Sequence, residues 1–312
     1  MTKLAALGIA LSTLLLSSMS LKAEMPDLSN IKLRNLAGQA VKLDTLLTDK
    51  PIYLKFWASW CQPCRQQMPH LQHTFDQFGK KIDIISVNLG INDSLEEIIK
   101  TKKEFNLDLP IYIDESGILA QAVDLIATPY HVVIDSKGNI IHKGHEASAE
   151  LDNKLQKLAN NKQTAFSSTP SHKADISSAS LLISDPQTRL IFFTSAWCGW
   201  YLEKSRPQMA KNCDEAQKTI NTLYQQHPQL HWHGILTRLW TGNKELAEYR
   251  KKFDIKHPLI VDSTNTVFLR YQIKTFPTLI AVKGDQELFR LSDFSQPLKA
   301  QQLLSRAIGE GS

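Results

Sequence analysis

The feature that most restricts the fold of this chain is one order of apolar segments that occurs in it twice. From Ile82, at the start of an apolar strand, to Pro129 is 47 residues, and from Leu230 to Pro277 is also 47 residues. A helical stretch and a short apolar strand lie between these ends in both halves, and chance does not explain such agreement. The sequence therefore predicts two duplicated domains.

The predicted elements of each half alternate between strand and helix. The first half contains strands at residues 52–56, 82–87 and 111–113, helices at 62–78, 94–105 and 119–123, a hairpin at 131–134 and 140–143, and a last helix at 150–158. The second half contains strands at 190–193, 230–236 and 258–262 and a helix at 244–253. This order predicts an α/β fold of two tandem domains, each a mixed central sheet flanked by helices.

Composition indicates where the domains begin and end. A polar stretch at residues 160–180 has no apolar periodicity, which predicts a linker between a first domain at 24–159 and a second domain at 181–312. The formal net charge of +5 is modest, and the chain has no basic stripe. We therefore expect no nucleic-acid partner.

Residues 1–23 have the pattern of a signal peptide. Lys3 precedes an apolar run at residues 4–16, and residues 21–23 form a candidate cleavage triplet. The run is shorter than the ~20 residues that a membrane-spanning helix needs. We expect an exported, periplasmic protein that is soluble after cleavage, with a mature chain that begins near Glu24.

Two short stretches repeat a cysteine motif: W-C-Q-P-C at residues 60–64 and W-C-G-W-Y at residues 197–201. Cysteines in an exported protein pair unless something keeps them reduced. Cys61 and Cys64 are too close in sequence to link distant parts of a fold, so the pair indicates a redox role. A zinc site would need two further ligands, and no second C-x-x-C or nearby H-x-x-H supplies them.

The position of the first motif explains its chemistry. A strand that leads directly into a helix places Cys61 at the helix N-terminus, where free N–H groups and the helix dipole stabilise a thiolate. Cys64 lies one turn further on and can close the ring. Pro63 suits a first turn because its missing N–H has no partner there. The sequence predicts an exposed nucleophile, Cys61, and a resolving thiol, Cys64.

The first half resembles the TlpA/ResA-like branch of exported thioredoxins. The resemblance covers residues 26–158 and, more loosely, residues 180–310. It is carried by F-W-A-S-W-C-Q-P-C at 56–64, the proline eight residues after Cys61, V-N at 87–88, D-L-P-I-Y-I-D at 108–114 and T-P at 128–129.

The resemblance implies a thioredoxin fold and a thiol-disulfide oxidoreductase that needs no cofactor. It also implies that Thr128-Pro129 is a cis peptide against the cysteines, with the Thr128 backbone paired to an extended client segment. Trp60, Gln62 and Pro63 are the other residues that it implies contact the client.

Two residues depart from the family pattern. Many thioredoxins carry a buried acid five or six residues before the nucleophile, where this chain has Lys55. The ResA-like branch often has a glutamate three residues after its second cysteine, where this chain has Gln67. Both changes remove a candidate general base near Cys64. Lys55 could also be a strand lysine that extends its amine to solvent.

The family suggests a reductant that takes electrons from a membrane thiol reductase and passes them to oxidised extracytoplasmic proteins, with cytochrome c apoproteins as one target. A disulfide oxidase or isomerase is the closest alternative, because the sequence does not determine the direction of electron flow. A copper-binding or copper-delivery protein is an alternative of another class, since Met68 and His70 lie near the two thiolates. A chaperone-like binding protein is the third alternative.

The second motif retains only the first of its two cysteines. Cys198 has the place of the nucleophile, but Tyr201 stands at the resolving position, so a C-x-x-C cycle is excluded there. From Cys198 to Leu230 is 32 residues, which is 11 more than the 21 residues of the corresponding part of the first half. Cys213 lies in this longer stretch.

The longer stretch determines whether these two cysteines can pair. In one straight helix, the 15 residues from Cys198 to Cys213 span about 22 Å, whereas a disulfide needs Cα atoms within about 7 Å. Pro207 interrupts the helix and allows the chain to fold back. Our hypothesis is a Cys198–Cys213 disulfide. The alternatives are a buried Cys213 with an idle Cys198, or an exposed Cys198 that forms mixed disulfides.

Overall fold

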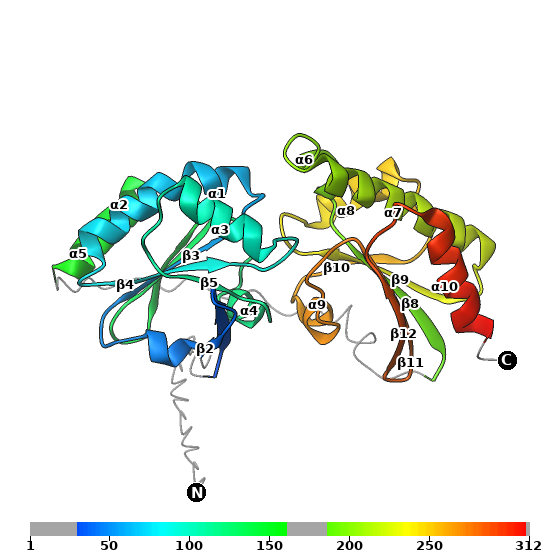
Figure 1. Ribbon diagram of the computed structural model, residues 1–312, viewed down its shortest axis with the longest axis horizontal. Helices are drawn as coiled ribbons and strands as arrows, with labels where there is room; N and C mark the ends of the chain where they lie inside the picture. Colours follow the sequence, from blue (N-terminus) through cyan, green and yellow to red (C-terminus); the bar gives the residue numbers. More distant parts are fainter. Residues whose placement is uncertain (1–29, 161–185, 310–312) are drawn as a thin grey trace, which may run out of the picture.

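The computed structural model describes residues 30–160 and 186–309, which form two lobes side by side, each with its own sheet (Figure 1). The signal peptide predicted at residues 1–23, and all of the predicted linker except residue 160, lie outside the described residues. No helix within the two described ranges is long and apolar enough to cross a membrane.

The first lobe contains β1 Lys32–Asn35, β2 Ala40–Lys42, the 3-10 helix η1 Leu43–Leu46, β3 Ile52–Trp57, α1 Gln62–Gln66, α2 Met68–Phe78, β4 Asp83–Asn88, α3 Leu95–Glu104, β5 Ile111–Ile113, α4 Ile118–Ala122, β6 Tyr130–Ile134, β7 Ile140–Gly144 and α5 Ala149–Ala159. The second lobe contains β8 Thr188–Thr194, α6 Cys198–Tyr201, α7 Pro207–Gln226, β9 His231–Thr237, α8 Asn243–Lys252, β10 Leu259–Asp262, α9 Thr266–Arg270, β11 Thr278–Lys283, β12 Gln286–Leu291 and α10 Pro297–Gly309.

The two sheets share one strand order. The first sheet runs β2-β1-β5-β4-β3-β6-β7, and the second runs β10-β9-β8-β11-β12, which repeats the last five strands of the first. β3 in the first sheet and β8 in the second each pair parallel with one neighbour and antiparallel with the other. The predicted fold class is confirmed. The hairpin of β1 and β2 was not predicted, because these strands are short and alternate only weakly between polar and apolar residues.

The helical stretch predicted at residues 62–78, which contains Pro69, is divided in the structure. The stretch at residues 62–78 is two helices, α1 and α2, which meet at Gln67. Pro69 has no N–H to donate, and its ring would clash with the carbonyl of Arg65 in a continuous helix. It lies instead in the first turn of α2, where a free N–H is not needed. The break brings the Gln67 backbone N–H onto the Cys64 carbonyl at 3.1 Å.

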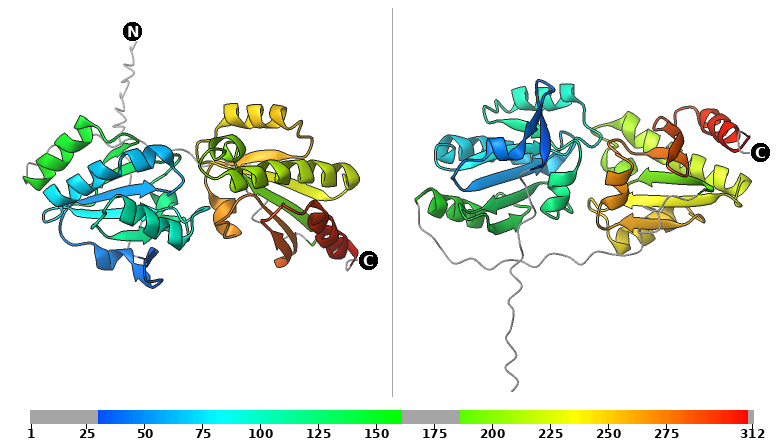
Figure 2. Two further views of the ribbon diagram at one scale, coloured as in Figure 1. Left: turned by 45° about the horizontal axis from the view of Figure 1, so that its top comes forward. Right: turned by 90° about the horizontal axis from the view of Figure 1, so that it is seen from below.

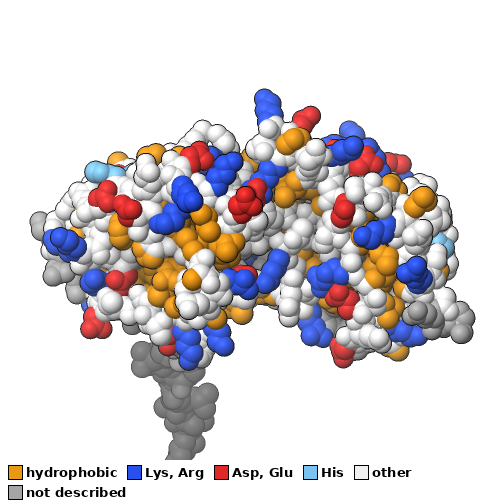
Figure 3. All heavy atoms as spheres, in the orientation of Figure 1, with side chains coloured by type: hydrophobic (Ala, Val, Ile, Leu, Met, Phe, Trp, Pro, Cys, Tyr) orange, Lys and Arg blue, Asp and Glu red, His pale blue; other side chains and the backbone are white. Residues whose placement is uncertain are grey.

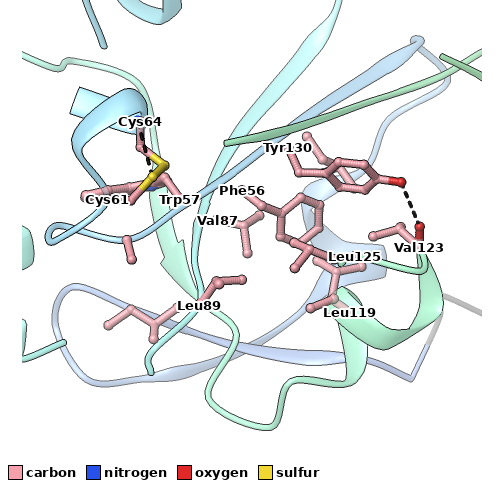
Figure 4. Packing of buried hydrophobic residues seen from close by; sticks show 14 of the residues in the cluster. Phe56, Trp57, Cys61, Cys64, Val87, Leu89, Leu119, Val123, Leu125 and Tyr130 are labelled. Atoms are coloured by element: carbon pink, nitrogen blue, oxygen red, sulfur yellow. Dashed lines mark hydrogen bonds between the residues drawn. A yellow bond between two sulfur atoms is a disulfide. The ribbon is translucent and has the colours of Figure 1, made fainter. Parts of the chain in front are cut away.

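The core of the first lobe lies directly behind the redox motif. All six residues of β3 are buried, as expected for a central strand covered on both faces. Figure 4 shows Phe56 packed against Tyr130 and Val87, with the Cys61–Cys64 disulfide beyond Trp57. The Tyr130 hydroxyl donates to the Val123 carbonyl at 3.3 Å, which gives this buried tyrosine its polar partner.

The buried hydrophobic residues continue from the first lobe into the second through Trp60, Trp197 and Phe276. The lobes lie side by side (Figure 2), and the surface is indented along their boundary (Figure 3). Asn92 lies at the centre of this interface. Its backbone N–H donates to Lys274 O at 2.9 Å, and its side-chain amide bonds both the N–H and the carbonyl of Phe276 at 2.8 Å. Directional bonds therefore accompany the apolar contact.

Asp114 is a buried carboxylate that accepts a hydrogen bond from α4, and its burial makes the stability of the protein depend on pH. Its Oδ2 accepts the Ala120 N–H at 2.8 Å, and burial raises its pKa to about 6. The folded chain thus holds a proton that the unfolded chain loses near pH 4, so the free energy of unfolding falls as pH rises from about 4 to about 6. We expect Asp114→Asn to flatten this decline, by about 3 kcal/mol at most. Urea unfolding across this pH range measures it, with the exposed Asp76→Asn as control.

Candidate redox site

Cys61 and Cys64 form the centre of the candidate site. Cys61 caps α1, and its Sγ accepts the Cys64 backbone N–H at 3.2 Å. The two cysteines form a disulfide with Cα atoms 5.2 Å apart. Pro63 lies in the first turn of α1, as predicted. The buried strand β3 positions Cys61 because the chain turns directly from its end into the helix.

The loop before β6 closes one side of the disulfide. Thr128-Pro129 is a cis peptide, as the family resemblance implied, and Phe276-Pro277 is the corresponding cis peptide in the second lobe. The Thr128 hydroxyl donates to Cys61 Sγ at 3.5 Å. His145 Nδ1 bonds the Pro129 carbonyl at 2.8 Å. The chain segment that would align a client is therefore held against the reactive sulfur.

The predicted exposure of Cys61 was wrong, because the side chains of both Cys61 and Cys64 are fully buried. The second lobe supplies part of the cover. Trp60 stacks on Trp197 with ring centroids 4.9 Å apart, and the Gln62 backbone N–H donates to the Tyr201 hydroxyl at 2.9 Å. Sequence reasoning missed this contact because nothing in a sequence pattern pairs residues 139 positions apart.

Two cavities flank Pro63 and Thr128. The first has a volume of about 570 Å³ and is walled mainly by aromatic side chains of the second lobe, including Trp200 and Trp240. The second has a volume of about 620 Å³ and is polar, with Gln67, His70, His145 and Glu146 in its wall. Trp240 borders both. Of the residues expected to contact a client, Pro63 and Thr128 line both cavities, whereas Trp60 is buried in the interface.

The two departures from the family pattern lie in one buried polar cluster. Lys55 is fully buried rather than extended to solvent, and its Nζ donates to Gln67 Oε1. His131, the register partner of Lys55 on β6, brings its Nε2 within 3.0 Å of the same amine and 2.9 Å of Gln67 Oε1. Its Nδ1 lies 2.6 Å from the Tyr53 hydroxyl. No carboxylate is bonded to Lys55 among the described residues.

Burial sets the charge of this cluster. It lowers the pKa of Lys55 well below the ordinary 10.5, and the charge of Glu146 opposes this only in part. Burial, together with the nearby Lys55, lowers the pKa of His131 to about 2. The imidazole therefore stays neutral at every physiological pH. Where the family has an acid that could carry a negative charge, this chain has nitrogen bases.

The second lobe folds back between its two cysteines. Cys198 begins α6, and Cys213 lies in α7, which starts afresh at Pro207. The turn between these helices brings the Cα atoms of Cys198 and Cys213 within 6.1 Å of each other. The structure joins their sulfurs in a disulfide. Both side chains are buried. The pairing in the oxidised protein remains our proposal.

Metal ions in proteins need sets of ligand side chains. The described residues contain no group of three or more His, Cys, Asp or Glu side chains that could hold a metal ion. Met68, named above as a possible copper ligand, is buried in the core, and His70 is bonded to Asp152 at 2.8 Å.

The comparisons with known proteins identify the family of the chain. The Redoxin family matches residues 21–160. The chain belongs to the ResA/TlpA-like family of thioredoxin-fold thiol-disulfide oxidoreductases.

Three relatives illustrate the extent of the similarity. The thioredoxin-like protein YneN of Bacillus subtilis is 32% identical over 42% of this chain and 76% of its own length. The thiol-disulfide oxidoreductase ResA of Bacillus thuringiensis is 27% identical over 41% of this chain and 75% of its own length. The crystal structure of StoA from Bacillus subtilis is 23% identical, with a TM-score of 0.35, over 40% of this chain and 94% of StoA.

Replacement of Lys55 tests whether its amine stabilises the folded protein. In Lys55→Met, His131 and Gln67 keep each other as partners, and no amine needs to be desolvated. We expect a free energy of unfolding between the wild-type value and about 2 kcal/mol above it. Lys55→Ala should lose about 2–5 kcal/mol through the cavity that it leaves. Urea unfolding measures both. A clear loss in Lys55→Met would contradict this expectation and assign the amine a structural role.

The pairing of Cys198 with Cys213 is tested by mass spectrometry of the non-reduced, alkylated protein. We expect neither cysteine to carry the alkyl group until a reductant is added. Loss of the bond in Cys213→Ser should cost about 3 kcal/mol of stability, as expected for a closed loop of 15 residues. Alkylation of both residues without reductant would exclude the disulfide.

Proposed function

We propose that this protein reduces disulfides of exported client proteins, with Cys61 as nucleophile and Cys64 as resolving thiol. The observation that carries the proposal is the placement of Cys61 at the N-terminus of α1, bonded to Cys64 and in contact with the Thr128 hydroxyl. The Cys64 N–H, which Cys61 Sγ accepts at 3.2 Å, stabilises a thiolate on Cys61.

The reaction proceeds by two exchanges. The Cys61 thiolate attacks one sulfur of the client disulfide, forms a mixed disulfide and expels the other client sulfur as a thiolate. Cys64 then loses its proton and attacks Cys61 Sγ, which releases the reduced client and forms the Cys61–Cys64 disulfide. Two electrons and two protons from a donor restore the dithiol.

The cellular location, the electron donor and the clients are also part of the proposal. Residues 1–23 direct export to the periplasm, a membrane thiol reductase supplies the electrons, and cytochrome c apoproteins are among the clients. Support comes from the leader-like N-terminus and from relatives named thiol-disulfide oxidoreductase ResA. The domain bounds of 24–159 and 181–312 belong to the same proposal.

The opposite direction, client oxidation, is the second candidate, and the Lys55–His131 cluster favours it. A carboxylate near Cys64 would repel a thiolate and destabilise the reduced form, whereas this cluster contains nitrogen bases. Equilibration with glutathione distinguishes the two directions. A reduction potential near the ~−270 mV of thioredoxin supports the reductant, and one near the ~−120 mV of DsbA supports the oxidant.

A trapping experiment tests the roles of the two cysteines. In Cys64→Ser the mixed disulfide on Cys61 cannot be resolved, so we expect clients to remain attached to Cys61 in non-reducing gels of periplasmic extract. Cys61→Ser should trap nothing and should abolish insulin reduction with dithiothreitol. If Cys64→Ser captures no protein while the wild type reduces insulin, Cys61 is not the attacking residue.

A further inference from the structure

The second lobe places a defined segment on the face around Cys61. This segment, residues 197–206, contains the degenerate motif and the turn that follows it. Its Trp197 stacks on Trp60, the residue immediately before Cys61. Its Tyr201 accepts the hydrogen bond of the Gln62 N–H, in the first turn of α1. An aromatic side chain and an oxygen acceptor of the second lobe thus lie against the two neighbours of Cys61.

The same segment carries a cation into the first lobe. Arg206 donates to the Asn92 carbonyl at 2.7 Å, to Ser59 Oγ at 2.5 Å and to Glu97 Oε2 at 2.8 Å. Its guanidinium also lies 3.4 Å from Asp93 Oδ1. Ser59 is two residues before Cys61, so the cation binds the loop that leads into the redox motif.

Asp93 shows that this face needs a positive partner. Its side chain is fully buried and accepts the Ser59 N–H and the Asn88 amide, each at 2.7 Å. Arg206 is the only cation paired with it among the described residues. Burial raises the pKa of Asp93, and Arg206 is one of the groups that oppose the rise. A buried carboxylate whose cation is removed is costly, so a replacement cation would be favoured here.

We propose that the face around Cys61 is a docking surface for client segments that carry an aromatic side chain and a basic side chain near their disulfide, and that such segments displace residues 197–206. This inference rests on the proposed function. The segment that now occupies the face has this chemistry: a ring on Trp60, an oxygen on the Gln62 N–H, and a guanidinium beside Asp93 and Glu97. A client must offer matching groups to compete with residues 197–206 for this face.

The aromatic cavity beside the redox pair is the place where displacement begins. It lies between Pro63 and Thr128 on one side and Trp200 and Tyr201 on the other. Trp200 is 61% exposed, an unusual state for a tryptophan, and it belongs to the segment that must move. A client side chain that enters here contacts the occupying segment and the redox loops at once.

Alkylation of Cys61 in the reduced full-length protein measures how well residues 197–206 cover it. We expect Arg206→Ala and Tyr201→Ala to raise the iodoacetamide rate at Cys61 several-fold, as followed by peptide mass spectrometry. Arg290→Ala, which removes an arginine paired with Glu287 on β12, should leave the rate unchanged. Unchanged alkylation rates at Cys61 in all variants would contradict the inference that residues 197–206 cover it.

Two variants with smaller changes test the same contacts in case the alanine variants misfold. Glu97→Gln weakens the Arg206 contact from the first lobe, and Tyr201→Phe removes only the hydroxyl that meets Gln62. Circular dichroism and urea unfolding confirm that each variant is folded. Both variants should raise the rate at Cys61 less than the alanine variants do, and no rise in either would count against the proposal.

Peptide disulfides test the partner chemistry. Three cyclic peptides share one disulfide and carry Trp and Arg, Trp and Glu, or Ser and Arg beside it. We expect the Trp–Arg peptide to oxidise the reduced protein about tenfold faster than the Trp–Glu peptide, and faster than the Ser–Arg peptide. In Glu97→Gln, the difference in rate between the Trp–Arg peptide and the Trp–Glu peptide should be smaller. Equal rates for all three peptides would overturn the proposal.

The outcomes separate this inference from the proposed function. If the wild type reduces insulin but alkylation and peptide rates show no dependence on Arg206 or on peptide charge, only the inference fails. If Cys61 neither reduces insulin nor traps clients, the proposed function fails and the inference with it.

Discussion

The backbone hydrogen bonds on both sides of β3 hold the site together. β3 pairs parallel with β4, up to Trp57 opposite Asn88, and antiparallel with β6, up to Phe56 opposite Tyr130. Because of these directions, the end of β3, the end of β4 and the start of β6 meet at one edge of the sheet. Cys61, the loop with Asn92, and the cis proline Pro129 follow or precede these strand ends. Register alone thus brings together three segments that are far apart in sequence.

The second lobe repeats this convergence, and its edge faces the first. Trp197 and Trp240 each lie three residues after the end of their strands, β8 and β9, and Phe276 lies two residues before β11. The rings of Trp240 and Phe276 lie edge-on to Trp197, at 5.1 and 5.6 Å, and Trp197 in turn stacks on Trp60. The repeated strand order therefore gives the molecule two motif edges, and the edge without a resolving cysteine packs against the other.

The sequence predicted those parts of the molecule that depend on local patterns. The apolar strands and the cysteine pair at a helix start all have signals within a few residues. Pro69 divides the helical stretch predicted at residues 62–78 into two helices, because its ring cannot continue the first of them. The hairpin of β1 and β2 was missed because its strands are too short for a period to show.

The parts that could not be predicted are contacts between distant positions. Lys55 was recognised as a departure, but only the register of β3 and β6 reveals that it faces His131. The two neighbours of Cys61 contact Trp197 and Tyr201, which lie in the second lobe. A single sequence gives no signal for such pairs, because each side chain is compatible with many partners until the sheets are assembled.

Asn92 binds the first lobe to the second through every polar group that it has. Its backbone N–H, its backbone carbonyl and both ends of its side-chain amide are all bonded to the second lobe, in a loop where its φ is 50°. A fragment cut at the linker would have to solvate these four groups and expose Trp60 to water. The loop beside the thiols would then be free to adopt other shapes. Reactivity measured on such a fragment would describe a different surface from the one that clients meet in the whole chain.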